Sequence, residues 1–173
     1  MNSNLIILIP KSRGADAIEN FRPIALANFQ FKIITKILAD RLSLIAPKII
    51  SGHQRGFIPG RNISDCVIVT SEAINVLSKK CFAGNIALKI DIKKAFDSID
   101  WTFLLAVLKQ FGFNDLFCNW ISEILHSARL SILINGKSLG YFNCDKGVRQ
   151  GDPLPPLFFV LLKRYIAGAS PKL

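Results

Sequence analysis

The most constraining feature of this chain is a short run in which apolar residues alternate with polar ones and a carboxylate stands near the end. Residues 86–92 read IALKIDI. A period of two places Ile86, Leu88 and Ile90 on one face of a β-strand and directs Asp91 to the other. An ionised carboxylate there is costly unless it is paired, solvated or bound to a metal ion. We therefore predict a strand over residues 86–92 that presents Asp91 as a candidate functional group, although an Asp at the end of a strand is often only a turn former.

The composition predicts a folded domain with a polyanionic partner. The chain has 173 residues, of which 50% are hydrophobic, enough for one domain with a core. A formal net charge of +10 and a pI near 9.7 favour nucleic acid as that partner. A solvated basic surface without a ligand explains the same charge equally well.

The location and the redox state of the chain follow from its apolar runs and its cysteines. Every apolar run is interrupted well before the ~18 residues that a membrane span needs, and the first run is too short for a signal peptide. The four cysteines show no paired spacing, so we expect reduced thiols and no zinc site. We expect an intracellular protein, nuclear or cytoplasmic, that is not secreted and does not contact a membrane.

Apolar spacing and turn residues predict an α+β fold. Ser64 or Asp65, Asp100 and Asn114 are expected to begin helices as N-caps, and Asn135-Gly136 is expected to close a hairpin. The expected helices cover residues 31–45 (ending before Pro47), 64–80, 100–111 and 114–126. The expected strands cover residues 5–9, 20–26, 86–92, 129–134 and 138–143.

Two segments carry a recognisable pattern. Leu88 to Asp97 (LKIDIKKAFD) resembles the first catalytic motif of reverse transcriptases, and Gly147 to Leu157 (GVRQGDPLPPL) resembles the second. The resemblance is closest to the non-LTR (LINE-type) retrotransposon branch and covers residues 5 to about 162. It extends through three further segments in the family order: residues 21–26 (FRPIAL), 56–61 (GFIPGR) and 135–136 (NG).

The resemblance implies part of a right-hand polymerase, the fingers and the first part of the palm. Residues 1–80 would be fingers-like, residues 81–162 a partial palm and residues 163–173 a divergent tail, all within one incomplete reverse transcriptase domain. The implied chemistry is RNA-templated addition of deoxynucleotides to a primer 3′-hydroxyl. The implied partners are therefore an RNA template, a DNA primer and dNTPs, while the oligomeric state stays open.

The resemblance also implies roles for individual residues. The Asp91 carboxylate and the Ile92 carbonyl would bind a catalytic Mg²⁺ or Mn²⁺ ion, and Phe96 would exclude a ribose 2′-hydroxyl. Asp97 is expected to be structural. The implied nucleotide contacts are Arg149, Gln150, Gly151, Arg22 and Lys32, and the implied nucleic-acid contacts are Arg61 and Lys11.

The chain also departs from the family pattern. Reverse transcriptases carry two adjacent aspartates beyond the second motif, and this sequence contains no Asp-Asp. Pro155 stands where a small Ser is common. One carboxylate set leaves the metal ions incompletely liganded, so we expect no polymerisation by this chain alone, and a partial palm would expose apolar surface. Two alternatives are a non-catalytic nucleic-acid-binding remnant and a fragment that does not fold stably.

Overall fold

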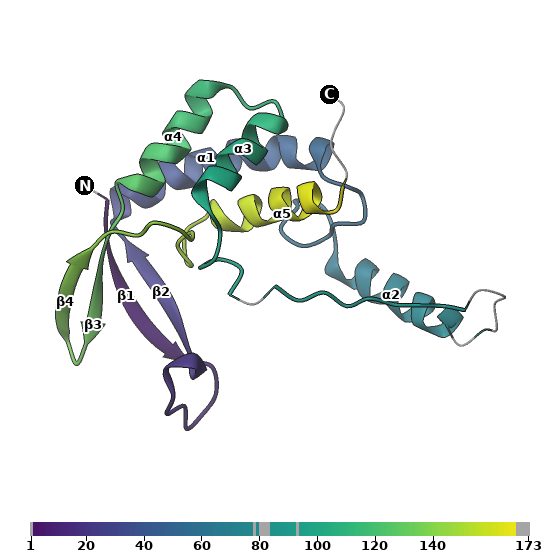
Figure 1. Ribbon diagram of the computed structural model, residues 1–173, viewed down its shortest axis with the longest axis horizontal. Coiled ribbons are helices and arrows are strands. Elements are labelled where there is room, and N and C mark those ends of the chain that lie inside the picture. Colours follow the sequence, from purple (N-terminus) through teal and green to yellow (C-terminus); the bar gives the residue numbers. More distant parts are fainter. Residues whose placement is uncertain (1, 78, 80–83, 93, 169–173) are drawn as a thin grey trace.

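The computed structural model describes residues 2–77, 79, 84–92 and 94–168, and it is a mixed α+β fold with one small sheet (Figure 1). The strands are β1 (Ser3–Pro10), β2 (Phe21–Ala27), β3 (Arg129–Ile134) and β4 (Lys137–Phe142). The helices are α1 (Phe29–Ile49), α2 (Ile63–Leu77), α3 (Trp101–Gln110), α4 (Asp115–His126) and α5 (Pro155–Ile166), with a 3₁₀ turn at Ile18–Asn20.

The sheet has the order β2-β1-β3-β4 and leaves β2 at one edge. β1 pairs antiparallel with β2 and parallel with β3, so the N-terminal strand joins two hairpins that are far apart in the sequence. The β3–β4 hairpin closes at Asn135 (φ 50°) and Gly136 (φ 77°), as predicted, because an Asn-Gly pair accepts the positive φ angles of a tight turn. The predicted strand at residues 5–9 is confirmed within β1, and that at residues 20–26 is confirmed from Phe21 onward, because Asn20 ends the 3₁₀ turn.

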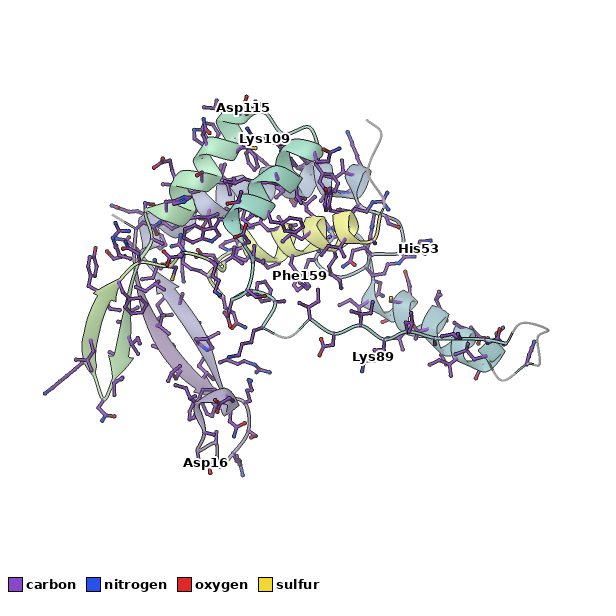
Figure 2. The ribbon with its side chains drawn as sticks, viewed as in Figure 1. Asp16, His53, Lys89, Lys109, Asp115 and Phe159 are labelled. Carbon is purple, nitrogen blue, oxygen red and sulfur yellow. The ribbon has the colours of Figure 1, made fainter. Side chains whose placement is uncertain are left out.

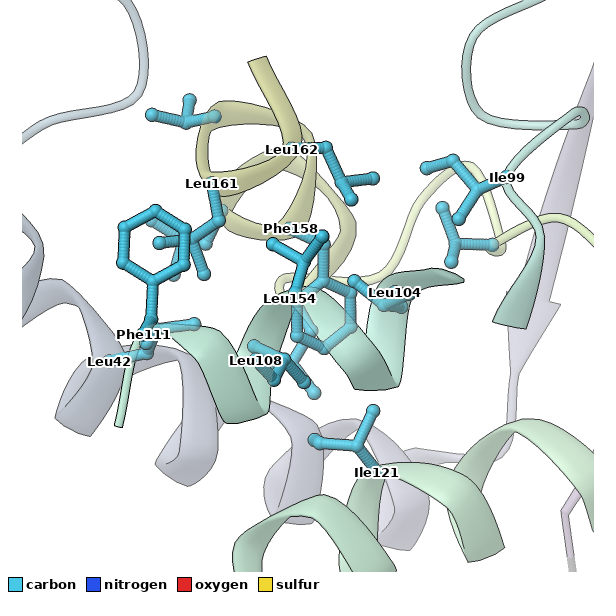
Figure 3. Close-up of a cluster of buried hydrophobic side chains, with 14 of the residues drawn as sticks. Leu42, Ile99, Leu104, Leu108, Phe111, Ile121, Leu154, Phe158, Leu161 and Leu162 are labelled. Atoms are coloured by element: carbon cyan, nitrogen blue, oxygen red, sulfur yellow. The ribbon is translucent and has the colours of Figure 1, made fainter. Parts of the chain in front are cut away.

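The hydrophobic core lies among α1, α3, α4 and α5, on the far side of the strand ends from the hairpin tips (Figures 1 and 3). Leu104 and Leu108 of α3 and Ile121 of α4 are fully buried, and Phe158 of α5 is 2% exposed. Apolar residues three and four positions apart share one face of a helix, which is why α3 and α5 can bury such a face against each other. None of the helices in the described ranges combines the length and the apolar character needed to cross a bilayer.

The helix caps confirm two predictions and correct two others. Asp100 and Asn114 cap α3 and α4 through bonds from Phe103 N–H (2.7 Å) and Phe117 N–H (2.9 Å). The prediction that the first helix ends before Pro47 is wrong, because α1 runs to Ile49. A proline this close to the end of a helix removes only one backbone hydrogen bond, and the helix continues past it. Ser64 and Asp65 do not cap α2.

The cap of α2 is instead Asn62. Its side-chain oxygen accepts a hydrogen bond from Ser64 N–H at 3.0 Å, and α2 begins at Ile63. Pro155, which departs from the family pattern, occupies the first position of α5, where the missing N–H has no intrahelical partner in any case. The fold therefore accommodates this substitution without loss of a helix bond.

The prediction of a strand over residues 86–92 is wrong. This segment belongs to none of the four described strands, and Figure 2 shows Lys89 on a stretch of chain outside the sheet and the core. Ile86, Leu88 and Ile90 are 84 to 87% exposed. A strand requires a neighbour for its backbone bonds, and no described strand pairs with this segment. Apolar surface is therefore exposed here and on α2, which buries no residue, whereas the expected exposure was at the sheet of a partial palm.

Candidate functional site

The central loop, residues 146–152, lies between β4 and α5 and is attached to the segment that follows Asp91. Gly147 N–H donates to Ile99 O at 2.7 Å, and Val148 N–H donates to Phe96 O at 2.7 Å. The bond to Phe96 joins the segments that resemble the first and second catalytic motifs, and the bond to Ile99 lies two residues beyond the first of them. The structure thus brings the two motifs together at the backbone level.

The other side of the central loop lies on the free edge of β2. Ala25 N–H donates to Gln150 O at 3.0 Å, so the loop takes up a hydrogen-bond donor that an edge strand would leave unpaired. Gly151 has φ +114°, and a Cβ added there would lie 3.1 Å from Ala25 O. Gly151 is therefore needed for this close approach of two backbones.

Gly147 makes a still closer approach on the opposite side. Its φ is +82°, and an added Cβ would lie 2.8 Å from Asp97 O. Its carbonyl accepts a hydrogen bond from the Trp101 indole at 2.7 Å. The peptide of Gly147 is thereby fixed between the turn at Asp97 and the start of α3.

A cavity of about 370 Å³ opens beside the central loop. Most of its wall is apolar, and five residues with charged or amide side chains also line it. These five are Asp97, Asp145, Lys146, Arg149 and Gln150. Burial raises the pKa of the Cys144 thiol, which lines the same cavity, so that thiol stays protonated and unreactive at neutral pH. A largely apolar pocket with a few convergent polar groups is typical of a small-molecule site.

The Arg149 side chain is turned into the protein. Its Nη1 donates to Asn2 Oδ1 (2.5 Å) and Asn4 Oδ1 (3.0 Å), and its Nη2 donates to Ile124 O (3.1 Å). Its Cζ lies 4.6 Å from the centroid of the Phe31 ring. The side chain is 10% exposed. Every one of these contacts is internal to the chain.

Asp152 completes this buried polar group. Its Oδ2 lies 3.4 Å from Arg149 Nε, and its side chain is 5% exposed. Burial raises the pKa of the Asp152 carboxyl, while the charges of Arg149 and, more weakly, Lys32 oppose that rise. Burial likewise lowers the pKa of the Arg149 guanidinium, and Asp152 opposes that change. The two charges stabilise each other in a desolvated position.

Asp91 lies apart from the cavity, because it is exposed on the unpaired segment and is not among the cavity-lining residues. Within the described ranges, no group of three or more His, Cys, Asp or Glu side chains gathers to hold a metal ion. One carboxylate and the Ile92 carbonyl are too few ligands for a two-ion site. The described residues therefore do not form a complete magnesium site.

Phe96 lies at the junction of the two motifs. It is half-buried and packs against the core, with its ring centroid 5.7 Å from that of Phe159 on α5. Its backbone carbonyl is the acceptor for the central loop. The Phe96 ring thus packs against α5 and stays partly accessible to solvent.

The basic residues singled out in the sequence have different surroundings. Arg22 is exposed on the edge strand β2, and Lys32 is half-buried on α1 near Asp152. Lys11 is exposed, and its ammonium donates to Glu19 O at 2.6 Å. Arg22 and Lys32 thus lie on β2 and α1, two of the elements that contact the central loop.

Arg61 is occupied by the protein backbone. Its guanidinium donates to four carbonyl oxygens, those of Pro47, Ile50, Ser51 and Gln54, at 2.6 to 3.2 Å. Two of these carbonyls, those of Pro47 and Ile50, lie at the C-terminal end of α1, where carbonyls lack an N–H partner within the helix. Arg61 therefore closes the end of α1 and fixes the turn that follows.

Comparison with known proteins agrees with this geometry. Residues 9–169 match the family model described as reverse transcriptase (RNA-dependent DNA polymerase). The chain therefore belongs to the reverse transcriptase family, and it is a reverse transcriptase domain fragment of the non-LTR retrotransposon type.

Relatives of the chain come from retrotransposons and introns. It is 29% identical over 150 residues to the transposon TX1 uncharacterized 149 kDa protein of Xenopus laevis, and the matched residues make up 87% of this chain and 11% of that protein. It is 29% identical over 156 residues to the Pol polyprotein of the R2DM element of Drosophila melanogaster (90% and 14%). It is also 29% identical over 153 residues to a putative COX1/OXI3 intron 2 protein of Saccharomyces cerevisiae (86% and 16%). The chain thus spans less than a quarter of each relative.

Sequence reasoning missed the asparagines that hold Arg149. Asn4 is 4% exposed within an otherwise aliphatic strand, and Asn2 lies just before it. A polar side chain in a buried strand requires a hydrogen-bond partner, so Asn4 was the available signal. What no local pattern revealed is that the partner comes from residue 149.

Proposed function

We propose that this chain binds the nucleotide and the template within a reverse transcriptase domain. The substrates of the whole protein would be an RNA template, a DNA primer and dNTPs. The observation that supports this most is the position of the central loop, which bonds to Phe96 and Ile99 on one side and to Ala25 on the other and lines a cavity. In a polymerase, such a junction would hold the templating base pair between fingers and palm.

The architecture that we propose follows the family. Residues 1–80 would form the fingers-like region, residues 81–162 the start of the palm and residues 163–173 a divergent tail. The contacts of the central loop with Asn2, β1, β2 and α1 support an arrangement in which the start of the palm lies against the fingers-like region.

The roles of single residues are also proposals. The Gln150 side chain and the Gly151 backbone would form the wall against the incoming nucleotide, since Gln150 lines the cavity. Phe96 would exclude a ribose 2′-hydroxyl. Arg22 and Lys32 would contact the triphosphate, since both lie on elements that adjoin the loop. Arg61 and Lys11 would contribute positive charge toward the template strand, Arg61 with its planar face because its Nη1 and Nη2 donors are occupied.

The metal chemistry would be shared with groups outside the described set. We propose Asp91 and the Ile92 carbonyl as this chain's contribution to a Mg²⁺ or Mn²⁺ site. Because these two groups cannot clamp both the attacking and the leaving oxygen, we expect the chain alone to bind primer–template without extending it.

A primer-extension assay with a parallel binding titration tests this proposal. Purified chain is mixed with an RNA template, a DNA primer, dNTPs and Mg²⁺, alongside the variants Asp91→Asn and Asp16→Asn. Asp16 is an exposed carboxylate at the tip of the β1–β2 connection (Figure 2) and is the matched control. We expect binding and no extension by any of the three proteins.

Three other outcomes are informative. Extension by the wild type that is lost in Asp91→Asn and kept in Asp16→Asn would establish Asp91 as catalytic and overturn the expectation of inactivity. Neither binding nor extension by a folded protein would refute the proposed function. Binding that no dNTP strengthens would favour a remnant that only holds nucleic acid.

A further inference from the structure

Arg149 is the centre of a buried polar group that we call the Arg149 cluster: Arg149, Asn2, Asn4 and Asp152. Its contacts come from β1, the residue before β1, α4 and α1, four parts of the chain that are separated in sequence by up to 147 positions. Asn2 also donates to Ile124 O at 2.8 Å, so the asparagine and the guanidinium share one acceptor. The cluster is a network in which both asparagines and the Asp152 carboxylate contact Arg149.

Most donors of the guanidinium are engaged by protein atoms. Nη1 has two acceptors, Nη2 has one and Nε faces Asp152, while the plane of the group lies against Phe31. The side chain is 10% exposed, where it lines the cavity. A phosphate that replaced these acceptors would leave buried and half-buried oxygens without a donor, which is costly.

Arg149 and its neighbours Val148 and Gln150 line the cavity. Val148 N–H bonds to Phe96 O, and Gln150 O accepts from Ala25 N–H. The side chain of Arg149 anchors the loop on one side, and these two backbone bonds hold it on the other. A residue anchored in this way fixes the peptide planes of its neighbours.

We propose that Arg149 is a positioning residue, not a ligand: the Arg149 cluster fixes the peptides of Gln150 and Gly151 at the wall of the nucleotide cavity. This inference deepens the proposed function and rests on it for the identity of the ligand. The physical anchoring of the loop does not depend on that identity and is tested separately.

Hydrogen exchange of single amides tests the anchoring without any ligand. In Arg149→Met, the amides of Val148 and Ala25, which bond across the loop, should exchange about tenfold faster or more, because hydrogen bonds to a charged group are lost. The amide of Leu104 in α3, which bonds to Asp100 O, should be unchanged. Equal protection of Val148 and Ala25 in variant and wild type would overturn the proposal.

Two further variants complete the test, one as a control for the lost charge and one as a substitute for Arg149→Met. Arg129→Met removes one positive charge and two bonds to backbone carbonyls at the end of α4, but no contact with the central loop, and it should leave the Val148 and Ala25 amides unchanged. Should Arg149→Met fail to fold, Asn2→Ala removes one acceptor of the cluster and is expected to raise the same two exchange rates by a smaller factor.

Binding of primer–template separates positioning from direct contact. A lysine or arginine that contacts a phosphate contributes about 0.9 to the slope of log affinity against log salt. Because Arg149 touches no phosphate in this proposal, the slope of Arg149→Met should equal that of the wild type, while dNTP affinity in the complex falls about tenfold. A slope reduced by about 0.9 would show a direct contact. Failure of the wild type to bind would refute the proposed function, and the exchange experiment would still decide the anchoring.

Discussion

Gly147→Ala should destabilise the protein more than other substitutions of left-handed glycines. An alanine at φ +82° costs roughly 1–2 kcal/mol because its Cβ crowds the backbone. The new Cβ would also lie 2.8 Å from Asp97 O and 3.1 Å from two further atoms of the Asp97 backbone, so the loop must move. That movement breaks the bonds of Gly147 N–H to Ile99 O and Val148 N–H to Phe96 O, each worth about 0.5–1.5 kcal/mol.

The expected total for Gly147→Ala is about 2–5 kcal/mol, measured as a lower urea midpoint at unchanged slope. Gly14→Ala is the matched control, because Gly14 has φ +77° with no atom within 4 Å of an added Cβ. The control should lose only the conformational part, about 1–2 kcal/mol. Equal losses in the two variants would refute the close contact between the central loop and the Asp97 turn.

Three further predictions concern other parts of the fold. Leu104→Ala should cost about 2–5 kcal/mol in urea unfolding, because Leu104 is fully buried, whereas Ile90→Ala should change stability by less than about 0.5 kcal/mol, because Ile90 is 84% exposed. Arg61→Met should cost about 1.5–3 kcal/mol, because four carbonyls lose a charged donor, and trypsin should then cleave the turn after α1 faster. Burial raises the pKa of Asp152, so the native state binds more protons than the unfolded state between about 3.9 and the raised value. As the pH falls through that window, the unfolding free energy of the wild type should rise relative to that of Asp152→Asn. Parallel dependence of the two free energies on pH would contradict this.

Much of the fold could be predicted because its signals are local. Asp100 and Asn114 cap helices with their own side chains, and Asn135-Gly136 closes a hairpin by its own φ angles. The parallel pairing of β1 with β3 could not be predicted, because it joins residues more than 120 positions apart and leaves no local signature. Local patterns specify elements, and tertiary pairing decides their neighbours.

The failed strand at residues 86–92 shows the limit of periodicity. The alternation of Ile86, Leu88 and Ile90 correctly marks a sequence suited to a strand, but alternation supplies only one face and no neighbour. In the described structure these side chains remain exposed. The sequence pattern therefore indicates the capacity for a strand, and the hydrogen-bonding partner determines whether the strand forms.

The site could be predicted in part for a similar reason. The motifs correctly drew attention to the central loop, and Gly151 proves necessary for its approach to β2. Residue type alone could not separate an arginine that faces a ligand from one that is buried, and both Arg149 and Arg61 bond to the protein itself. Their roles depend on acceptors that are supplied by distant or irregular segments.

The central claim is that this chain binds primer–template through basic side chains that include Lys11, and a salt titration tests it most directly. Affinity for an RNA–DNA primer–template is measured from low to moderate salt for the wild type, Lys11→Met and Lys137→Met. Both lysines are exposed, and Lys137, on the β3–β4 hairpin, is the control. The account predicts a steep negative slope of log affinity against log salt that becomes shallower by about 0.9 in Lys11→Met and stays constant in Lys137→Met. Absence of binding by the folded wild type, or a slope that Lys137→Met changes as much as Lys11→Met, would contradict it.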